Sequence, residues 1–202
     1  MSNYINQVSD SLKNHISELA NNPCLFLRNP NVDFSRKRKI DFKTFIGIMM
    51  NSGGATMSKE LLDFFDFNKN TPSVSAFTQQ RSKVLPEAFE YLFKSFTDDN
   101  LPTTNNYHGY RLIACEGSNL TIATNQKDAR LLLYNYCELI TTHVIKQMKN
   151  NDKTKQVNFT IAIYICREYL RNKRNLSPPD VINLIEKHVL PVRPGRKDPR
   201  KV

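Results

Sequence analysis

The chain is short of acidic residues, has no tryptophan and contains no long apolar run. Among its 202 residues, 19 Asp and Glu stand against 29 Lys and Arg, giving a net charge of +10. Such an excess favours a polyanionic partner, because each phosphate that a cation neutralises releases counterions. No stretch reaches the roughly 18 apolar residues of a membrane span, and the N-terminus does not resemble a signal peptide. Nucleic acid is therefore a better candidate partner than a membrane.

Cysteine is also scarce. Cys24, Cys115, Cys137 and Cys166 lie far apart and form no CxxC pair. Zinc sites and disulfide frameworks have closer or more regular spacings, so we expect buried free thiols in a reducing cytoplasm. The histidines are equally scattered and predict no metal site.

Apolar residues at helical spacing predict a mainly α fold. A helical unit over residues 1–98 is expected, with helices that carry Phe42 to Met49, begin at Ser58 and Ser73 as N-caps, and follow Pro86. Polar composition predicts a linker over 99–109. Further helices are expected within 126–190, including 159–171, where alternating isoleucines leave a strand as the alternative. A basic tail occupies 191–202.

One convincing strand is predicted, YRLIACEGS, beginning at Tyr110 and ending before Glu116. It could pair with the short LTIA of 120–123. A hairpin of this kind is marginally stable without further cover, and its open edge could recruit another chain.

Two kinds of segment are candidates for DNA contact. The helix–turn–helix-like pair at 58–66 and 73–83 would bury Val74, Phe77 and Val84, while its outward side chains could reach base edges. These outward residues are Ser75, Thr78, Gln79, Arg81 and Lys83. Two basic segments suit phosphate contact, which positions a protein on DNA without specifying sequence. They comprise Arg36, Lys37, Arg38 and Lys39, and in the tail Arg193, Arg196, Lys197, Arg200 and Lys201. The alternative is a solvated helix face and solvated charge runs.

Three stretches, in the same order, resemble the DDE transposases of bacterial insertion sequences, in the group named after insertion sequence four. They are RKRKIDFKTFIGIMMNSGGATMSKELLDFF with TPSVSAFTQQRSKVLPEAFEYLF, then YHGYRLIACEGSNLTIATN, then ARLLLYNYCELITTHV through VNFTIAIYICREYLR to PPDVINLIEKHVLPVRPGRKDPRKV. The resemblance implies an N-terminal DNA-binding domain, and first strands of a ribonuclease-H-like catalytic domain at 110–125. It also implies a function in DNA transposition and recombination, with double-stranded transposon ends as the partner.

The chain departs from this family where the chemistry should lie. Glu116 occupies the position of the first of three catalytic Asp/Glu residues. The family's long middle, which carries the other two, would fall between Asn125 and Ala129, where only three residues stand. The pattern therefore resembles an internally deleted transposase that retains a remnant of the catalytic domain.

Strand transfer in this family uses two divalent ions, roughly 3.5–4 Å apart, held by three carboxylates. Glu116 alone cannot hold two metals, and Mg²⁺ demands near-ideal octahedral ligands. We therefore expect DNA binding without catalysis, no reliable metal site, and Mg²⁺ as the cofactor only if activity remains.

Three alternatives stay open: an inactive DNA-binding protein, a surviving metal-dependent transposase, and a degenerate gene product without activity. We expect a cytoplasmic, nucleoid-associated protein, with a homo-oligomer or a mixed assembly with intact transposase as possible partners.

Overall fold

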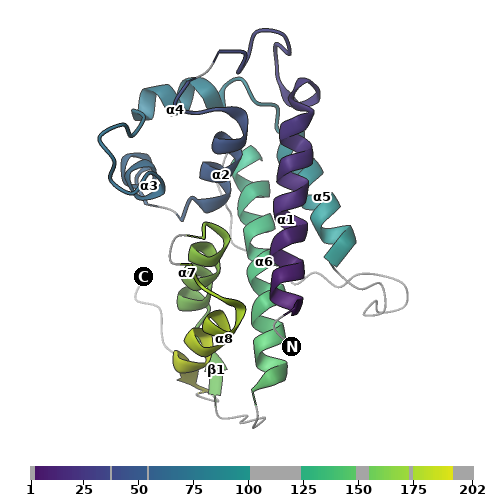
Figure 1. The fold of residues 1–202 in the computed structure, drawn as a ribbon, viewed down its shortest axis with the longest axis vertical. Helices are drawn as coiled ribbons and strands as arrows, with labels where there is room; N and C mark the ends of the chain where they lie inside the picture. The colour runs from purple at the N-terminus through teal and green to yellow at the C-terminus, as the bar shows by residue number, and fades with distance from the viewer. Residues whose placement is uncertain are drawn as a thin grey trace, which may run out of the picture. The chain divides into compact units, whose positions relative to one another are not determined.

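The fold is mainly helical, with one small antiparallel sheet among the described residues (Figure 1). The computed structural model describes residues 3–36, 38–53, 55–100, 124–148, 155–172 and 175–192, with only the backbone of 124–128. The helices are α1 (Asn3–Asn21), the 3-10 helix η1 (Pro23–Phe26), α2 (Phe42–Asn51), α3 (Met57–Phe64), α4 (Val74–Arg81), α5 (Glu87–Asn100), α6 (Thr124–Gln147), α7 (Phe159–Leu170) and α8 (Pro178–Lys187). The strands are β1 (Lys155–Val157) and β2 (Val189–Pro191).

The chain divides into two compact units. The large unit comprises residues 9–135, and the small unit comprises residues 1–8 and 136–202. The boundaries fall inside α1 and α6, so each of these helices contributes residues to both units.

A cluster of aromatic rings forms much of the core of the large unit. This phenylalanine cluster consists of Phe34, Phe42, Phe45, Phe77 and Phe89. Phe45 of α2 is fully buried at its centre, with its ring centroid 5.5 Å from that of Phe77 and 6.4 Å from that of Phe89. Aromatic pairs at such distances add to the stabilisation from area burial. The cluster therefore joins the loop before α2 to α2, α4 and α5.

Backbone pairing fixes the loop that precedes the basic segment. Leu27 forms an antiparallel bridge with Val84, and the amide of Arg28 donates to the carbonyl of Lys83 at 2.9 Å. Asp33 is buried and accepts a hydrogen bond from the amide of Asn29 at 3.0 Å. These contacts place residues 27–33 beside the segment that leaves α4.

Helices α2 and α3 approach closely because Gly47 has no side chain. A Cβ at Gly47 would lie 3.3 Å from the ring of Phe64. The connection between the two helices is held by buried Glu60, whose Oε1 accepts hydrogen bonds from the amides of Gly53 and Ala55, both at 2.8 Å. A carboxylate with two backbone donors is a strong link, since hydrogen bonds to charged acceptors are stronger than neutral ones.

The small unit packs α7 against α8 beside the β1–β2 pair (Figure 1). Cys137 and Cys166 are both fully buried, and a hydrogen bond of the Cys166 thiol to Cys137, together with burial, raises the pKa of that thiol well above its usual value. Helix α8 starts at a cap in which Asp180 accepts from the amide and hydroxyl of Ser177 at 2.9 and 2.6 Å. These hydrogen bonds lower the pKa of Asp180, because they favour its charged form.

Most predicted helices are confirmed, including α7, for which a strand was the alternative. Ser73 is the N-cap of α4, and its hydroxyl accepts from the amide of Ala76 at 3.2 Å. The Ser58 cap is wrong, because α3 begins at Met57 with Thr56 at the N-cap. Helix α5 continues to Asn100, two residues into the predicted linker.

Two further expectations need correction, and one element was not predicted. Val74, expected to face inward, is 40% exposed, because it is the first residue of α4 and lies at the end of the helix. Cys24 is exposed on η1. The β1–β2 pair was not predicted, since each strand has only three residues. The predicted strand at 110–123 lies outside the described residues.

Residues 126–128, where the sequence resemblance predicts a deletion, lie within a helix. The backbone of α6 is continuous from Thr124 to Gln147. Its buried residues include the predicted inward face, Leu132, Leu133, Tyr136, Ile140 and Val144.

None of the described helices combines the length and apolar character required to cross a membrane.

Replacing Phe45 by alanine should destabilise the large unit by about 3–5 kcal/mol, because it leaves a cavity at the centre of the phenylalanine cluster. Urea unfolding followed by circular dichroism measures this change. Leu25→Ala is the matched control, since Leu25 is 72% exposed and its truncation should change stability by less than about 0.5 kcal/mol. A loss below about 1 kcal/mol for Phe45→Ala would show that the cluster is not the core of the unit.

Candidate nucleic-acid interface

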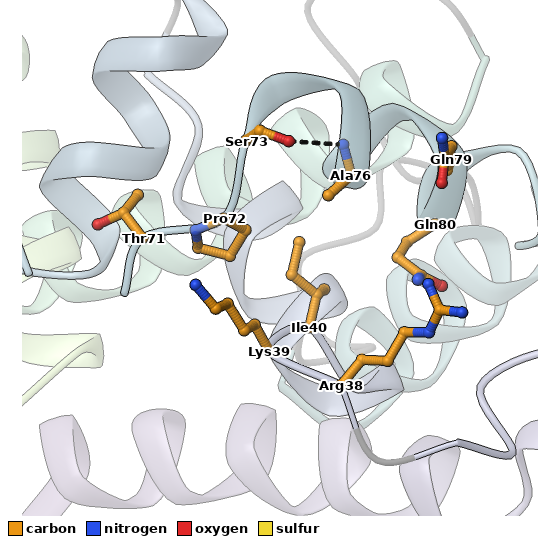
Figure 2. Close-up of a pocket in the computed structure, with 9 residues that line it drawn as sticks. All are labelled: Arg38, Lys39, Ile40, Thr71, Pro72, Ser73, Ala76, Gln79 and Gln80. Carbon is orange, nitrogen blue, oxygen red and sulfur yellow. Dashed lines mark hydrogen bonds between the residues drawn. The ribbon is translucent and has the colours of Figure 1, made fainter. Parts of the chain in front are cut away.

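Two adjoining hollows lie on the large unit, between the segment before α2 and helix α4. The large hollow has a volume of about 600 Å³ and the small hollow about 380 Å³. The large hollow is lined by Arg38, Lys39, Ile40, Thr71, Pro72, Ser73, Ala76, Gln79 and Gln80 (Figure 2). The small hollow is lined by Asn31, Val32, Phe34, Ser35, Arg36, Arg38, Ile40, Gln80 and Lys83. Arg38, Ile40 and Gln80 belong to both and form the wall between them.

The basic side of the hollows is positioned by the residues that follow it. Ile40 is 3% exposed and anchors the segment in the core, while the adjacent Arg38 and Lys39 are exposed. The next residue, Asp41, is the N-cap of α2 and accepts from the amide of Thr44 at 2.7 Å. A buried isoleucine and a helix cap thus hold two exposed cations at the rim of the large hollow.

The opposite side is the face of α4 that begins at its cap. Ser73, Ala76 and Gln80 line the large hollow, at the three- and four-residue spacing of one helix face. Phe77, one position beyond Ala76, is 1% exposed and joins α4 to the phenylalanine cluster. Figure 2 shows Ile40 and Pro72 in the hollow, with the Lys39 side chain directed toward Pro72 and that of Arg38 toward Gln80.

The charge of the hollows is positive. Among the described residues, no Asp or Glu lines either hollow, and no ion pair involves Arg36, Arg38 or Lys39. Lys83 differs from them, because its Nζ lies 4.0 Å from buried Asp33 and 5.8 Å from the centroid of the Phe34 ring. Three cations on this surface are therefore available for an external anion.

The two sequence-predicted DNA-binding segments converge here in part. Arg36, Arg38, Lys39, Gln79 and Lys83 line one or the other hollow. Ser75 and Thr78 are exposed on α4 but line neither, and the Thr78 hydroxyl donates to its own helix at the carbonyl of Val74, at 2.9 Å. Arg81 is half-buried at the end of α4. Lys37, Glu116 and the tail residues Arg193, Arg196, Lys197, Arg200 and Lys201 lie outside the described residues.

Sequence reasoning missed Gln80, which is 4% exposed. A signal was present, because Gln80 stands three residues after the inward Phe77 and four before the inward Val84. A polar residue at an inward position indicates a functional site more strongly than the exposed polar residues around it do.

The pair of helices also departs from a standard helix–turn–helix. Residues 65–73 connect α3 to α4, whereas the motif has a turn of about three or four residues. Asp66 and Phe67 reverse the chain with positive φ values of 53° and 57°.

In the described part of the chain, no group of three or more His, Cys, Asp and Glu side chains is arranged to hold a metal ion.

The class that these observations define is a mainly helical protein with a basic, hollowed surface on its large unit. No family model, curated protein or solved structure matches the chain.

Replacing Ser73 by alanine should lower the stability of the large unit by about 1 kcal/mol, because it removes the N-cap of α4. Ser75→Ala is the control, since Ser75 is exposed inside the same helix and alanine is the better helix former. Thermal unfolding of the two variants checks the difference. Equal melting temperatures for both would mean that the cap does not hold this side of the hollow.

Proposed function

We propose that this protein binds double-stranded DNA through the basic face of its large unit, and that its targets are transposon ends. The observation that carries the proposal is the convergence of Arg38 and Lys39 with Gln79 and Gln80 of α4 around one hollow, which no Asp or Glu of the described residues lines. The family resemblance of the sequence supports transposon ends as the particular DNA.

The two sides of the hollow suit different parts of a duplex. Arg36, Arg38 and Lys39 carry unpaired positive charge among the described residues and suit phosphate oxygens. Gln79 is exposed on the adjoining helix, and a glutamine amide can form a bidentate pair with an adenine edge in the major groove. The basic segment would therefore set position and α4 would contribute sequence preference.

We further propose that the protein binds DNA without cutting or joining it. The support comes from the sequence, in which Glu116 stands where the family carries the first of three metal-binding carboxylates, and the residues expected for the other two are missing. The two-ion mechanism needs all three carboxylates to converge.

The double variant Arg38→Ala/Lys39→Ala should weaken binding to every duplex to a similar extent, because phosphate contacts carry no sequence information. The plot of log binding constant against log salt concentration should become shallower by about 2, roughly one unit for each lost phosphate contact. Fluorescence anisotropy of labelled duplexes at several salt concentrations measures both effects.

Lys187→Ala is the control for this experiment, because Lys187 is exposed in the last turn of α8, in the small unit. Gln79→Ala provides the complementary variant and should reduce the preference for end DNA over random duplex while leaving the salt slope unchanged. An unchanged slope in the double variant would exclude this face as the phosphate contact.

Incubation of insertion-sequence end DNA with the protein and Mg²⁺ or Mn²⁺ should give a mobility shift and no nicked or joined products. Glu116→Ala should shift the same DNA equally well, because binding is assigned to the large-unit face. Cleavage that disappears in Glu116→Ala would instead establish a working transposase, and the absence of any shift would favour a gene product without activity.

A further inference from the structure

Gln80 has a buried polar group whose hydrogen-bonding capacity is incomplete. The residue is 4% exposed, and its Oε1 has no hydrogen-bond partner among the described residues. A buried acceptor without a donor costs roughly 1–3 kcal/mol, so such groups are usually satisfied by a ligand or an ordered water. Gln80 lines both hollows, and its Oε1 is closed to solvent, so a donor bound in the large hollow reaches this oxygen once the carboxamide turns toward it.

The rest of the large hollow suggests what kind of molecule supplies that donor. Ile40 and Pro72 are buried apolar residues in its lining, and Arg38 and Lys39 stand exposed at its basic side (Figure 2). Its volume of about 600 Å³ lies within the range of roughly 300–1,000 Å³ typical of small-ligand sites. The apolar surface suits a flat base, the amide acceptor suits an N–H donor, and the two cations suit a phosphate.

We propose that the large hollow binds one unpaired nucleotide whose base carries an exocyclic amine. The amine donates to Oε1 of Gln80, the base packs on Ile40 and Pro72, and Arg38 and Lys39 contact the phosphate. A paired base in a groove does not satisfy this site, because the carboxamide of Gln80 is buried while that of Gln79 is exposed. The inference rests on the proposed function, because DNA bound at the basic face is the source of the unpaired nucleotide.

The test titrates the full chain with deoxyadenosine monophosphate, with its analogue lacking only the 6-amino group, and with inorganic phosphate. Deoxyadenosine monophosphate should bind most tightly, and loss of the amine should weaken binding about fivefold, the effect of one hydrogen bond. Inorganic phosphate should bind most weakly, since it contacts the cations alone. Calorimetry or ligand-observed magnetic resonance measures all three.

Gln80→Met keeps the length of the side chain and removes the acceptor, so it should abolish the difference between the two nucleotides. Gln7→Met is the matched control, because Gln7 is exposed on α1 and should leave the fivefold difference intact. If Gln80→Met does not fold, the comparison of the two nucleotides on the wild-type protein still tests whether the site recognises the amine. Equal binding of both, or no binding of either, overturns the proposal and assigns Oε1 to a buried water.

Competition with DNA separates the possible sources of the nucleotide. A blunt duplex shares Arg38 and Lys39 with the mononucleotide and should displace it in part. Stronger displacement by a duplex with a single-stranded adenine overhang identifies a strand end as the source, whereas equal displacement by the two duplexes identifies a free nucleotide. Both results support the site. Failure of the inference and failure of the proposed function are distinguishable. Binding of blunt duplex without a preference between the two nucleotides overturns only the nucleotide site. Binding of the nucleotide without binding of duplex overturns only the proposed function.

Discussion

The contact between Phe45 and Phe77 joins the two halves of the basic surface. Phe45 lies on α2, five residues after Ile40, and Phe77 lies on α4, three residues before Gln80. With both rings buried at a centroid distance of 5.5 Å, the segment that carries Arg38 and Lys39 is held opposite the face that carries Gln79 and Gln80. The surface therefore depends on an apolar contact that lies beneath it.

The cations of this surface are not equivalent, because burial divides them by role. Lys83 is held between Asp33, which is almost fully buried, and the ring of Phe34, so part of its charge is already balanced inside the protein. Arg38 and Lys39 are exposed, and no described carboxylate balances them. A count of basic residues treats all of these alike, whereas the structure distinguishes one cation that stabilises the fold from those that can meet an external anion.

Much of the helical architecture could be predicted because local physics determines it. Ser73 caps α4 through its own hydroxyl, and the stripe from Leu132 to Val144 repeats at the helical period, so neighbours in sequence suffice. The β1–β2 pair could not be predicted, because Lys155–Val157 pairs with a segment more than thirty residues away and has no pattern of its own. The burial of Gln80 was predictable from its helical spacing to Phe77 and Val84, whereas its place beside Ile40 was not, because Ile40 belongs to another segment.

The described lining of the two hollows and the rings that support it come from one part of the chain. Every described residue that lines the two hollows lies between Asn31 and Lys83, and their support comes from α2, α4 and α5. The phenylalanine cluster beneath the hollows likewise lies between Phe34 and Phe89. The face proposed to bind DNA is therefore assembled within this one stretch of the large unit.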